Sequence, residues 1–242
     1  MYGYAAPFYS NPIYYILLVP VLILSVYAQI KVSSTFKRYS KIPDRRGVTG
    51  AQAAYEVLRA HGIHDVQIRP CGGSLTDHYD PRDNTIYLSD SVYHAPTVAA
   101  VGVAAHEAGH AVQYAENYGP VRLRKAIIPA TQIGSKFSFI LLIIGMALYS
   151  QALFLTGILL FSLTTIFQLV TLPVEFNASA RAIETIEGQG LLEGEEIGGV
   201  KRVLRAAAMT YVAALLMSAL QLLRFVLIFL GRSDNGRRGG GR

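Results

Sequence analysis

Four long apolar runs alternate with polar segments along the chain. They cover residues 13–30, 133–149, 152–172 and 204–230. A helix that crosses the hydrocarbon core of a bilayer needs about 20 mostly apolar residues, and runs of this kind meet that need. The pattern predicts a mainly α-helical, multi-pass membrane protein. Only a few polar residues separate the second run from the third, so we expect these two to form a membrane hairpin.

The segment between the first two runs shows mixed periodicity and predicts an α+β insert with a short sheet. Residues 49–52, Thr-Gly-Ala-Gln, form a capping-box pattern that opens a helix. Residues 66–69 and 84–88 have the apolar and β-branched content of short strands. Residues 77–81, Asp-His-Tyr-Asp-Pro, predict a polar loop between these strands.

The composition supports a membrane protein and excludes other classes. Apolar residues make up 52% of the 242 residues and charged residues only 16%, and the mean hydropathy is +0.33. The net charge of +6 does not indicate a nucleic-acid partner, because the basic residues gather at the flanks of the apolar runs. The single cysteine, Cys71, excludes an internal disulfide and a cysteine-based zinc site.

Charge placement predicts which side of the membrane the insert occupies. Basic residues follow the first run and precede the second, so the positive-inside rule places the insert in the cytoplasm. Four spans would put the basic tail, residues 232–242, outside and against this bias. If the fourth run is re-entrant, there are three spans and the tail is cytoplasmic; both topologies stay open. The flanking residues are Lys31, Lys37, Arg38, Lys41, Arg45, Arg46, Arg122, Arg124, Lys125 and Lys136.

The clearest chemical signal is the HExxH motif in residues 103–113, VAAHEAGHAVQ. In a helix His106 and His110 lie one turn apart, so both imidazoles can bind one Zn²⁺ ion. Glu107 is placed to act as the general base on a zinc-activated water. The three titratable groups lie in an otherwise apolar helix, where they are costly without partners. The motif predicts a zinc-dependent peptidase.

The motif lacks a third ligand, and Glu175 is the best candidate. It follows the third apolar run directly, where Pro173 is predicted to open a new helix. Two crossings return the chain to the side of the insert, which would bring Glu175 to the histidine pair. The alternative is that Glu175 caps a helix N-terminus. The competing ligands are Glu184, Glu187, His78 and His94.

Three stretches together resemble a known family. Residues 74–81, 103–113 and 172–179 are similar to the YugP-type neutral zinc metallopeptidases of bacterial membranes, and the resemblance covers nearly the whole chain except the Gly/Arg tail. It implies a multi-pass plasma-membrane metalloendopeptidase related to the HtpX and CAAX-protease gluzincins. It also implies that His106, His110 and Glu175 bind Zn²⁺ and that Glu107 is the general base.

One position departs from the wider gluzincin pattern. Those enzymes commonly place an Asp a few residues after the ligand Glu, where it orients a ligand histidine. Here the region offers Asn177 and Ser179. We therefore expect that a carboxylate from elsewhere, or a carbonyl, orients the histidines. His78, Tyr79, Asn177 and Arg181 are unranked candidates for stabilising the oxyanion.

The expected function is hydrolysis of peptide bonds in membrane or membrane-adjacent proteins at the cytoplasmic face of a bacterial plasma membrane. The predicted strand at residues 84–88 is either the edge along which a peptide substrate binds or an ordinary sheet strand. Two alternatives to a peptidase are an inactive membrane scaffold and an ion-conducting protein that uses the His/Glu cluster.

The predicted organisation follows from these assignments. It consists of an N-terminal segment with the first transmembrane helix (1–30), a cytoplasmic zincin-like catalytic insert with the HExxH helix (31–132), a transmembrane hairpin (133–173), a third-ligand helix and connector (174–203), a fourth apolar span (204–231) and a disordered Gly/Arg tail (232–242).

Overall fold

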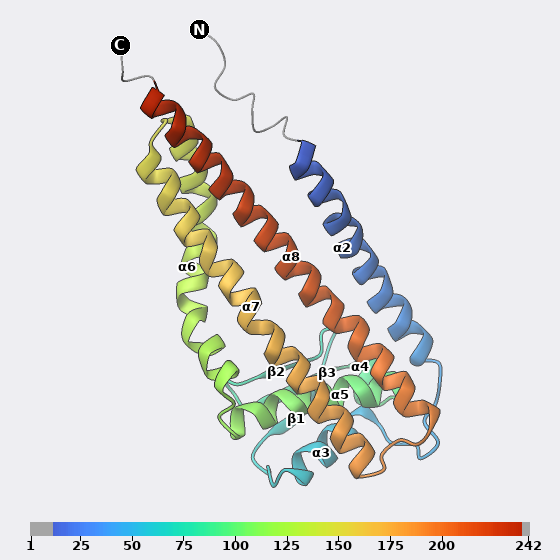
Figure 1. The fold of residues 1–242 in the computed structure, drawn as a ribbon. Coiled ribbons are helices and arrows are strands. Elements are labelled where there is room, and N and C mark those ends of the chain that lie inside the picture. The colour runs from blue at the N-terminus through green and yellow to red at the C-terminus, as the bar shows by residue number, and fades with distance from the viewer. Residues whose placement is uncertain (1–11, 239–242) are drawn as a thin grey trace. The chain divides into compact units, whose positions relative to one another are not determined.

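Four long helices dominate the computed structural model, which describes residues 12–238 (Figure 1). Between the first two lie three short strands and three shorter helices. In chain order the elements are α2 (Pro12–Tyr39), α3 (Gly50–Ala60), β1 (Gln67–Cys71), β2 (His78–Asp80), β3 (Thr85–Ser89), α4 (Asp90–Tyr93), α5 (Val98–Ala115), α6 (Gly119–Ala147), α7 (Gln151–Gly188) and α8 (Glu195–Arg238).

Internal contacts divide the chain into two compact units. The mixed unit comprises Tyr27–Leu123 and Thr171–Tyr211. Of the described residues, the helical unit comprises 12–26, 124–170 and 212–238. Every long helix contributes residues to both units, and all strands belong to the mixed unit.

All four long helices are long and apolar enough to cross a membrane. In the helical unit, apolar side chains such as Ile143 (61% exposed) and Leu159 (60% exposed) face away from the protein, which suits contact with lipid. The predicted multi-pass helical fold is confirmed at this level. α8 is one continuous helix from Glu195, without the break that a re-entrant segment would need. A buried cluster of Leu142, Phe154, Ile158, Phe161 and Phe225 forms the core of this unit.

α6 and α7 form the expected hairpin. α6 ends at Ala147 and α7 begins at Gln151. The two helices approach closely at Gly145, where a Cβ atom would lie 2.5 Å from the backbone nitrogen of Phe154. A side chain at this position would therefore force the helices apart.

The mixed unit contains a three-stranded sheet in the order β1-β3-β2. β1 runs parallel to β3, whereas β2 is antiparallel to it and pairs His78 with Tyr87 and Asp80 with Thr85. The prediction of a loop at residues 77–81 is therefore wrong for His78–Asp80. The hypothesis that residues 84–88 form the substrate-binding edge is wrong too, because β3 is the central strand and β2 lies at an edge.

Alternation along β2 explains how such a polar segment forms a strand. His78 and Asp80 lie on the outer face of the sheet, while Tyr79 points the other way and packs against the core. A loop was predicted because His78 and Asp80 are polar. Polar side chains are also common on the solvent-facing side of an antiparallel sheet, so they do not exclude a strand.

α5 is the central helix of the mixed unit. Its alanines and valines are almost all buried, and α3 packs along it through Ala53, Ala54 and Val57. The predicted capping box of α3 is confirmed: the Thr49 hydroxyl accepts from Gln52 N, and the Gln52 side chain accepts from Thr49 N. Figure 1 shows α3, α5 and the three strands gathered in one group.

The prediction that a helix begins at Pro173 is wrong, because α7 continues through this proline from Gln151 to Gly188. Proline removes one backbone hydrogen bond and disfavours a helix interior. Here the next turns are held by packing, since Val174 and Ala178 are fully buried in the mixed unit. Tertiary packing therefore outweighs the local preference.

The predicted connector and tail are also more helical than expected. α8 begins at Glu195, inside the segment expected to be a connector, and continues to Arg238, into the segment expected to be disordered. Residues 239–242 of that tail, and residues 1–11 at the other terminus, lie outside the described residues.

Candidate metal centre

α5 positions the HExxH residues. Thr97 caps the helix by accepting a hydrogen bond from Ala100 N, and the helix then runs unbroken through the motif. The rings of His106 and His110 lie one turn apart, with centroids separated by 4.7 Å. Both imidazoles therefore leave the same face of α5.

The carboxylate of Glu175 lies against this histidine pair. Its Oε2 atom is 3.4 Å from His106 Nε2 and 3.5 Å from His110 Nε2. The alternative role as a helix cap is wrong, because Glu175 lies in the interior of α7 rather than at an N-terminus. Among the described residues, these three form the one group of His, Cys, Asp and Glu side chains close enough to share a metal ion.

The two separations between Glu175 Oε2 and the histidine Nε2 atoms fit zinc, and all three donor atoms lie within 4.8 Å of one another. Zinc–nitrogen and zinc–oxygen bonds of about 2.0–2.2 Å in a tetrahedron put neighbouring ligand atoms about 3.3–3.6 Å apart. The two separations from Glu175 Oε2, 3.4 and 3.5 Å, fall in this range. Two imidazoles and one carboxylate leave a fourth position open, as catalytic zinc sites do.

The electrostatics of the site favour a cation. Burial lowers the pKa of His110, but the hydrogen bond to Glu175 and the charges of Glu107 and Glu175 outweigh this effect and raise that pKa above its ordinary value. Two carboxylates in a largely buried site therefore provide the negative charge that a divalent cation needs.

Glu107 lies beside the cluster and is held by the sheet. Its Oε2 atom accepts a 3.0 Å hydrogen bond from the backbone N–H of Tyr79 in β2. The residue is 9% exposed and follows directly on His106. Glu107 thus lies beside the His106–His110–Glu175 cluster without belonging to it, so its carboxylate is available for proton transfer.

Two neutral side chains contact the Nδ1 atoms of the histidines, the ring nitrogens that do not face Glu175. The side-chain carbonyl oxygen of Gln113 lies 3.1 Å from His110 Nδ1, which agrees with the expectation of a carbonyl partner. The Ser179 hydroxyl lies 3.1 Å from His106 Nδ1. The expectation of a carboxylate or carbonyl is therefore wrong for His106, which has a hydroxyl partner instead.

Gln113 was missed by reasoning from sequence alone. It is a fully buried amide in the otherwise apolar helix α5, three residues after His110. The spacing from His110 is a usable signal in the sequence, since residues three apart on a helix are neighbours. Ser179 lies four residues after Glu175, in the region where the wider pattern has an Asp, and offers a hydroxyl to His106 instead.

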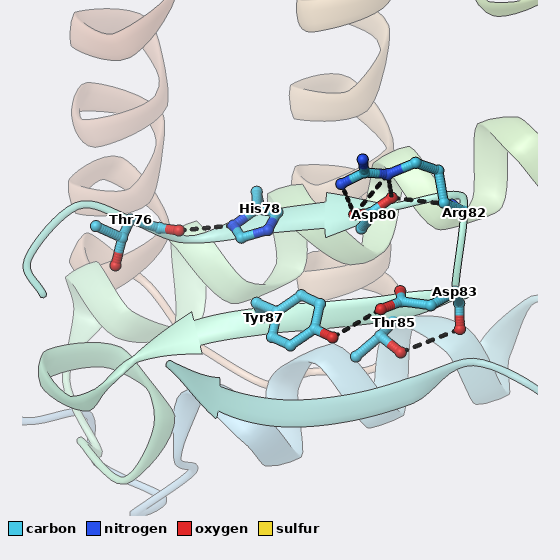
Figure 2. Close-up of polar contacts among 7 residues, drawn as sticks. All are labelled: Thr76, His78, Asp80, Arg82, Asp83, Thr85 and Tyr87. Atoms are coloured by element: carbon cyan, nitrogen blue, oxygen red, sulfur yellow. Dashed lines mark hydrogen bonds and ion pairs between the residues drawn. The ribbon is translucent and has the colours of Figure 1, made fainter. Parts of the chain in front are cut away.

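The competing ligands lie elsewhere. His78 is on the outer face of the sheet, stacked on Tyr87 and bonded through Nδ1 to Thr76 O, as Figure 2 shows. His94 packs against Tyr93 at the end of α4. Glu187 forms a 2.6 Å ion pair with Lys201. Glu184 is not part of the metal-binding group.

The four candidate oxyanion donors have other partners. The Tyr79 phenol donates to Asn84 Oδ1, and burial is the main cause that raises its pKa to about 12, so the group keeps its proton. Asn177 and Arg181 bond to each other, and Arg181 also forms an ion pair with Glu116. His78 lies on the outer face of the sheet, away from the cluster.

An apolar multi-span chain with a His-His-Glu cluster has the features of a membrane zinc metallopeptidase, and comparison with known proteins agrees. The family model described as “Putative neutral zinc metallopeptidase” matches residues 14–230, and the chain belongs to this family. The resemblance seen in the sequence is thus confirmed, with zinc as the cofactor.

A named relative comes from Bacillus subtilis (strain 168). “Putative membrane protease YugP” is 48% identical over 220 residues, which cover 90% of this chain and 98% of the relative. No solved structure matches the chain.

Replacing Gly109 by alanine tests the packing that brings Glu175 to the histidines. A Cβ atom at Gly109 would lie 2.6 Å from Ala178 O of α7, so the backbones must separate. We expect Gly109→Ala to destabilise the fold by about 1–3 kcal/mol, as overpacking does. Thermal unfolding of the purified protein in detergent measures this.

Gly198→Ala is the matched control. Gly198 lies in α8 of the same unit, and no atom outside its own turn of helix lies within 4 Å of the position that an added methyl group would occupy, so alanine fits there. Equal melting temperatures for the two variants would contradict the importance of close α5–α7 packing.

Proposed function

We propose that this protein is a membrane-embedded zinc metalloendopeptidase that hydrolyses peptide bonds of membrane or membrane-adjacent proteins. The observation that supports this most directly is the His106–His110–Glu175 cluster with Glu107 beside it. In this proposal His106, His110 and Glu175 hold Zn²⁺, and Glu107 is the general base.

The proposed chemistry divides between the metal and the chain. Bound zinc supplies Lewis-acid polarisation and lowers the pKa of water. Glu107 takes the proton of the attacking water and later gives it to the leaving amine. The 3.0 Å bond from Tyr79 N holds the Glu107 carboxylate in place for these transfers.

The edge strand β2 is the proposed binding surface for substrate. Its ladder with β3 uses one side of the strand, while the N–H of Tyr79 points from the other side toward Glu107. An extended peptide can add main-chain hydrogen bonds along such an edge, to backbone groups other than the Tyr79 N–H that is bonded to Glu107. The scissile bond of a peptide bound there would lie next to the general base.

The proposed location is a bacterial plasma membrane, with the metal centre on the cytoplasmic side. The support is the basic sequence on both flanks of the mixed unit, such as Lys37, Arg38 and Lys41 after the first apolar run. A site next to membrane spans would favour substrates that are themselves membrane-associated.

Glu107→Gln tests the general base. The amide keeps the shape of the side chain but cannot accept the proton, so cleavage of a casein-like substrate should fall by about 100- to 10,000-fold. Zinc content, measured by atomic spectroscopy on the purified protein, should stay as in the wild type.

The control for this variant is Glu187→Gln, which changes a partly exposed glutamate paired with Lys201 and should keep full activity. Cleavage that survives Glu107→Gln would remove Glu107 from the proposed role. Wild-type protein without chelator-sensitive cleavage would favour a scaffold, and ion flux that depends on the histidine pair would favour a conducting protein.

Glu175→Ala tests the third ligand. Loss of a direct ligand should weaken zinc binding by more than the roughly 10- to 100-fold typical of outer contacts. Chelator competition on protein in detergent measures the zinc dissociation constant.

Glu184→Ala is the matched control, because it removes a glutamate from the same helix but outside the cluster. It should bind zinc as the wild type does. If Glu175→Ala also keeps wild-type affinity, Glu175 is not the third ligand.

A further inference from the structure

A series of hydrogen-bonded side chains leads from the surface of the mixed unit to the Nδ1 atom of His110. We propose that Arg181 is a positioning residue for this zinc ligand and acts on it through Asn177 and Gln113. The proposal rests on the role of His110 as a ligand in the proposed function. The direction of each hydrogen bond in this series supports it.

The amide of Gln113 has a fixed orientation. Its Nε2 atom donates to Val174 O at 2.7 Å and to Asn177 Oδ1 at 3.0 Å. A backbone carbonyl can only accept, so the NH₂ end must face α7. The oxygen of Gln113 therefore faces His110.

This orientation decides where the imidazole of His110 carries its proton. Because Gln113 Oε1 is an acceptor, His110 Nδ1 has to be the donor across their 3.1 Å contact. In the neutral imidazole, which is the form that binds a metal, the Nε2 atom is then left with a lone pair, and it lies 3.5 Å from Glu175 Oε2. That is the form of histidine that binds a metal through Nε2.

Arg181 fixes the next amide outward. Its Nε atom donates to Asn177 Oδ1 at 2.8 Å. A guanidinium carries only donors and stays charged. It can therefore bond to Asn177 only when the amide oxygen, and not the NH₂ group, faces it. If that amide were turned round, its NH₂ group would face donors from both Arg181 and Gln113.

Arg181 is itself held in place. Its Nη1 atom forms a 2.6 Å ion pair with Glu116, and its guanidinium lies over the ring of Tyr118 at 5.9 Å. The side chain is only 19% exposed, whereas that of Glu116 is 47% exposed. A largely buried cation thus sets the orientation of Asn177. Asn177 Oδ1 and Val174 O then both accept from Gln113 Nε2, which leaves the oxygen of Gln113 facing His110.

The other histidine lacks such a device. His106 Nδ1 contacts the hydroxyl of Ser179, which can rotate to donate or to accept. A single hydroxyl therefore does not select a tautomer of His106. The directional network is specific to His110.

The test measures zinc affinity of the full-length protein in detergent by chelator competition, together with the visible spectrum of the Co²⁺ form. Gln113→Leu and Asn177→Leu interrupt this series of hydrogen bonds and should weaken zinc binding about 10- to 100-fold. Arg181→Met should weaken it about 10-fold and shift the Co²⁺ bands. Arg181→Lys keeps a donor-only cation and should restore most of the affinity.

Asn177→Asp distinguishes an effect of hydrogen-bond direction from an effect of side-chain packing. A carboxylate accepts from both Gln113 and Arg181, so this variant should bind zinc nearly as the wild type does. Arg46→Met is the matched control, because it breaks an exposed ion pair with Glu193 in the same unit. It should leave affinity and spectrum unchanged.

The outcomes are distinct. Arg181→Met with the affinity and spectrum of Arg46→Met would overturn this inference, as would equal losses in Asn177→Asp and Asn177→Leu. If Asn177→Leu does not fold, the comparison of Arg181→Met with Arg181→Lys decides. Wild-type protein that binds no zinc would overturn the proposed function as well, whereas a loss confined to Glu175→Ala would overturn this inference alone.

Discussion

The close approach of α5 to α7 at Gly109 is the constraint on which the metal centre depends. A methyl group there would meet Ala178 O at 2.6 Å, so only glycine permits this distance between the two backbones. The contacts of Glu175 with the histidines, of Ser179 with His106 and of Gln113 with Val174 O all cross the same interface. A small separation of the helices would weaken all of them at once.

The same interface explains why polar groups are tolerated in an apolar core. Gln113 is fully buried and Glu175 is 3% exposed, so each would be costly without partners. Gln113 uses both ends of its amide, and the Glu175 carboxylate lies between two imidazoles. Such a network stabilises one arrangement of the helices over others, because any slip would leave buried polar atoms unpaired. Rigidity of the site and specificity of the packing have a common cause.

Local sequence patterns predicted the individual helices and strands better than they predicted how those elements pair and pack. The capping box at Thr49 and the helix through His106 and His110 depend on residues a few positions apart, and both were predictable. The strand at His78–Asp80 was not, because its three residues become a strand only by pairing with β3. Helix α7 likewise continues through Pro173 because of packing in the mixed unit, which no local pattern contains.

The sequence by itself determined the four apolar helices, the family, the zinc cofactor and the HExxH pair. Each of these depends on composition, on one-turn spacing or on motif content. The sequence favoured Glu175 over its competitors as the partner of the histidines, and the tertiary structure brought it to them. Only the tertiary structure decided which strand forms the edge and which residues orient His110. Those relations join distant positions, such as His106 and Ser179, 73 residues apart. Periodicity along the chain records which face a residue occupies, but not which residue of another helix it will meet.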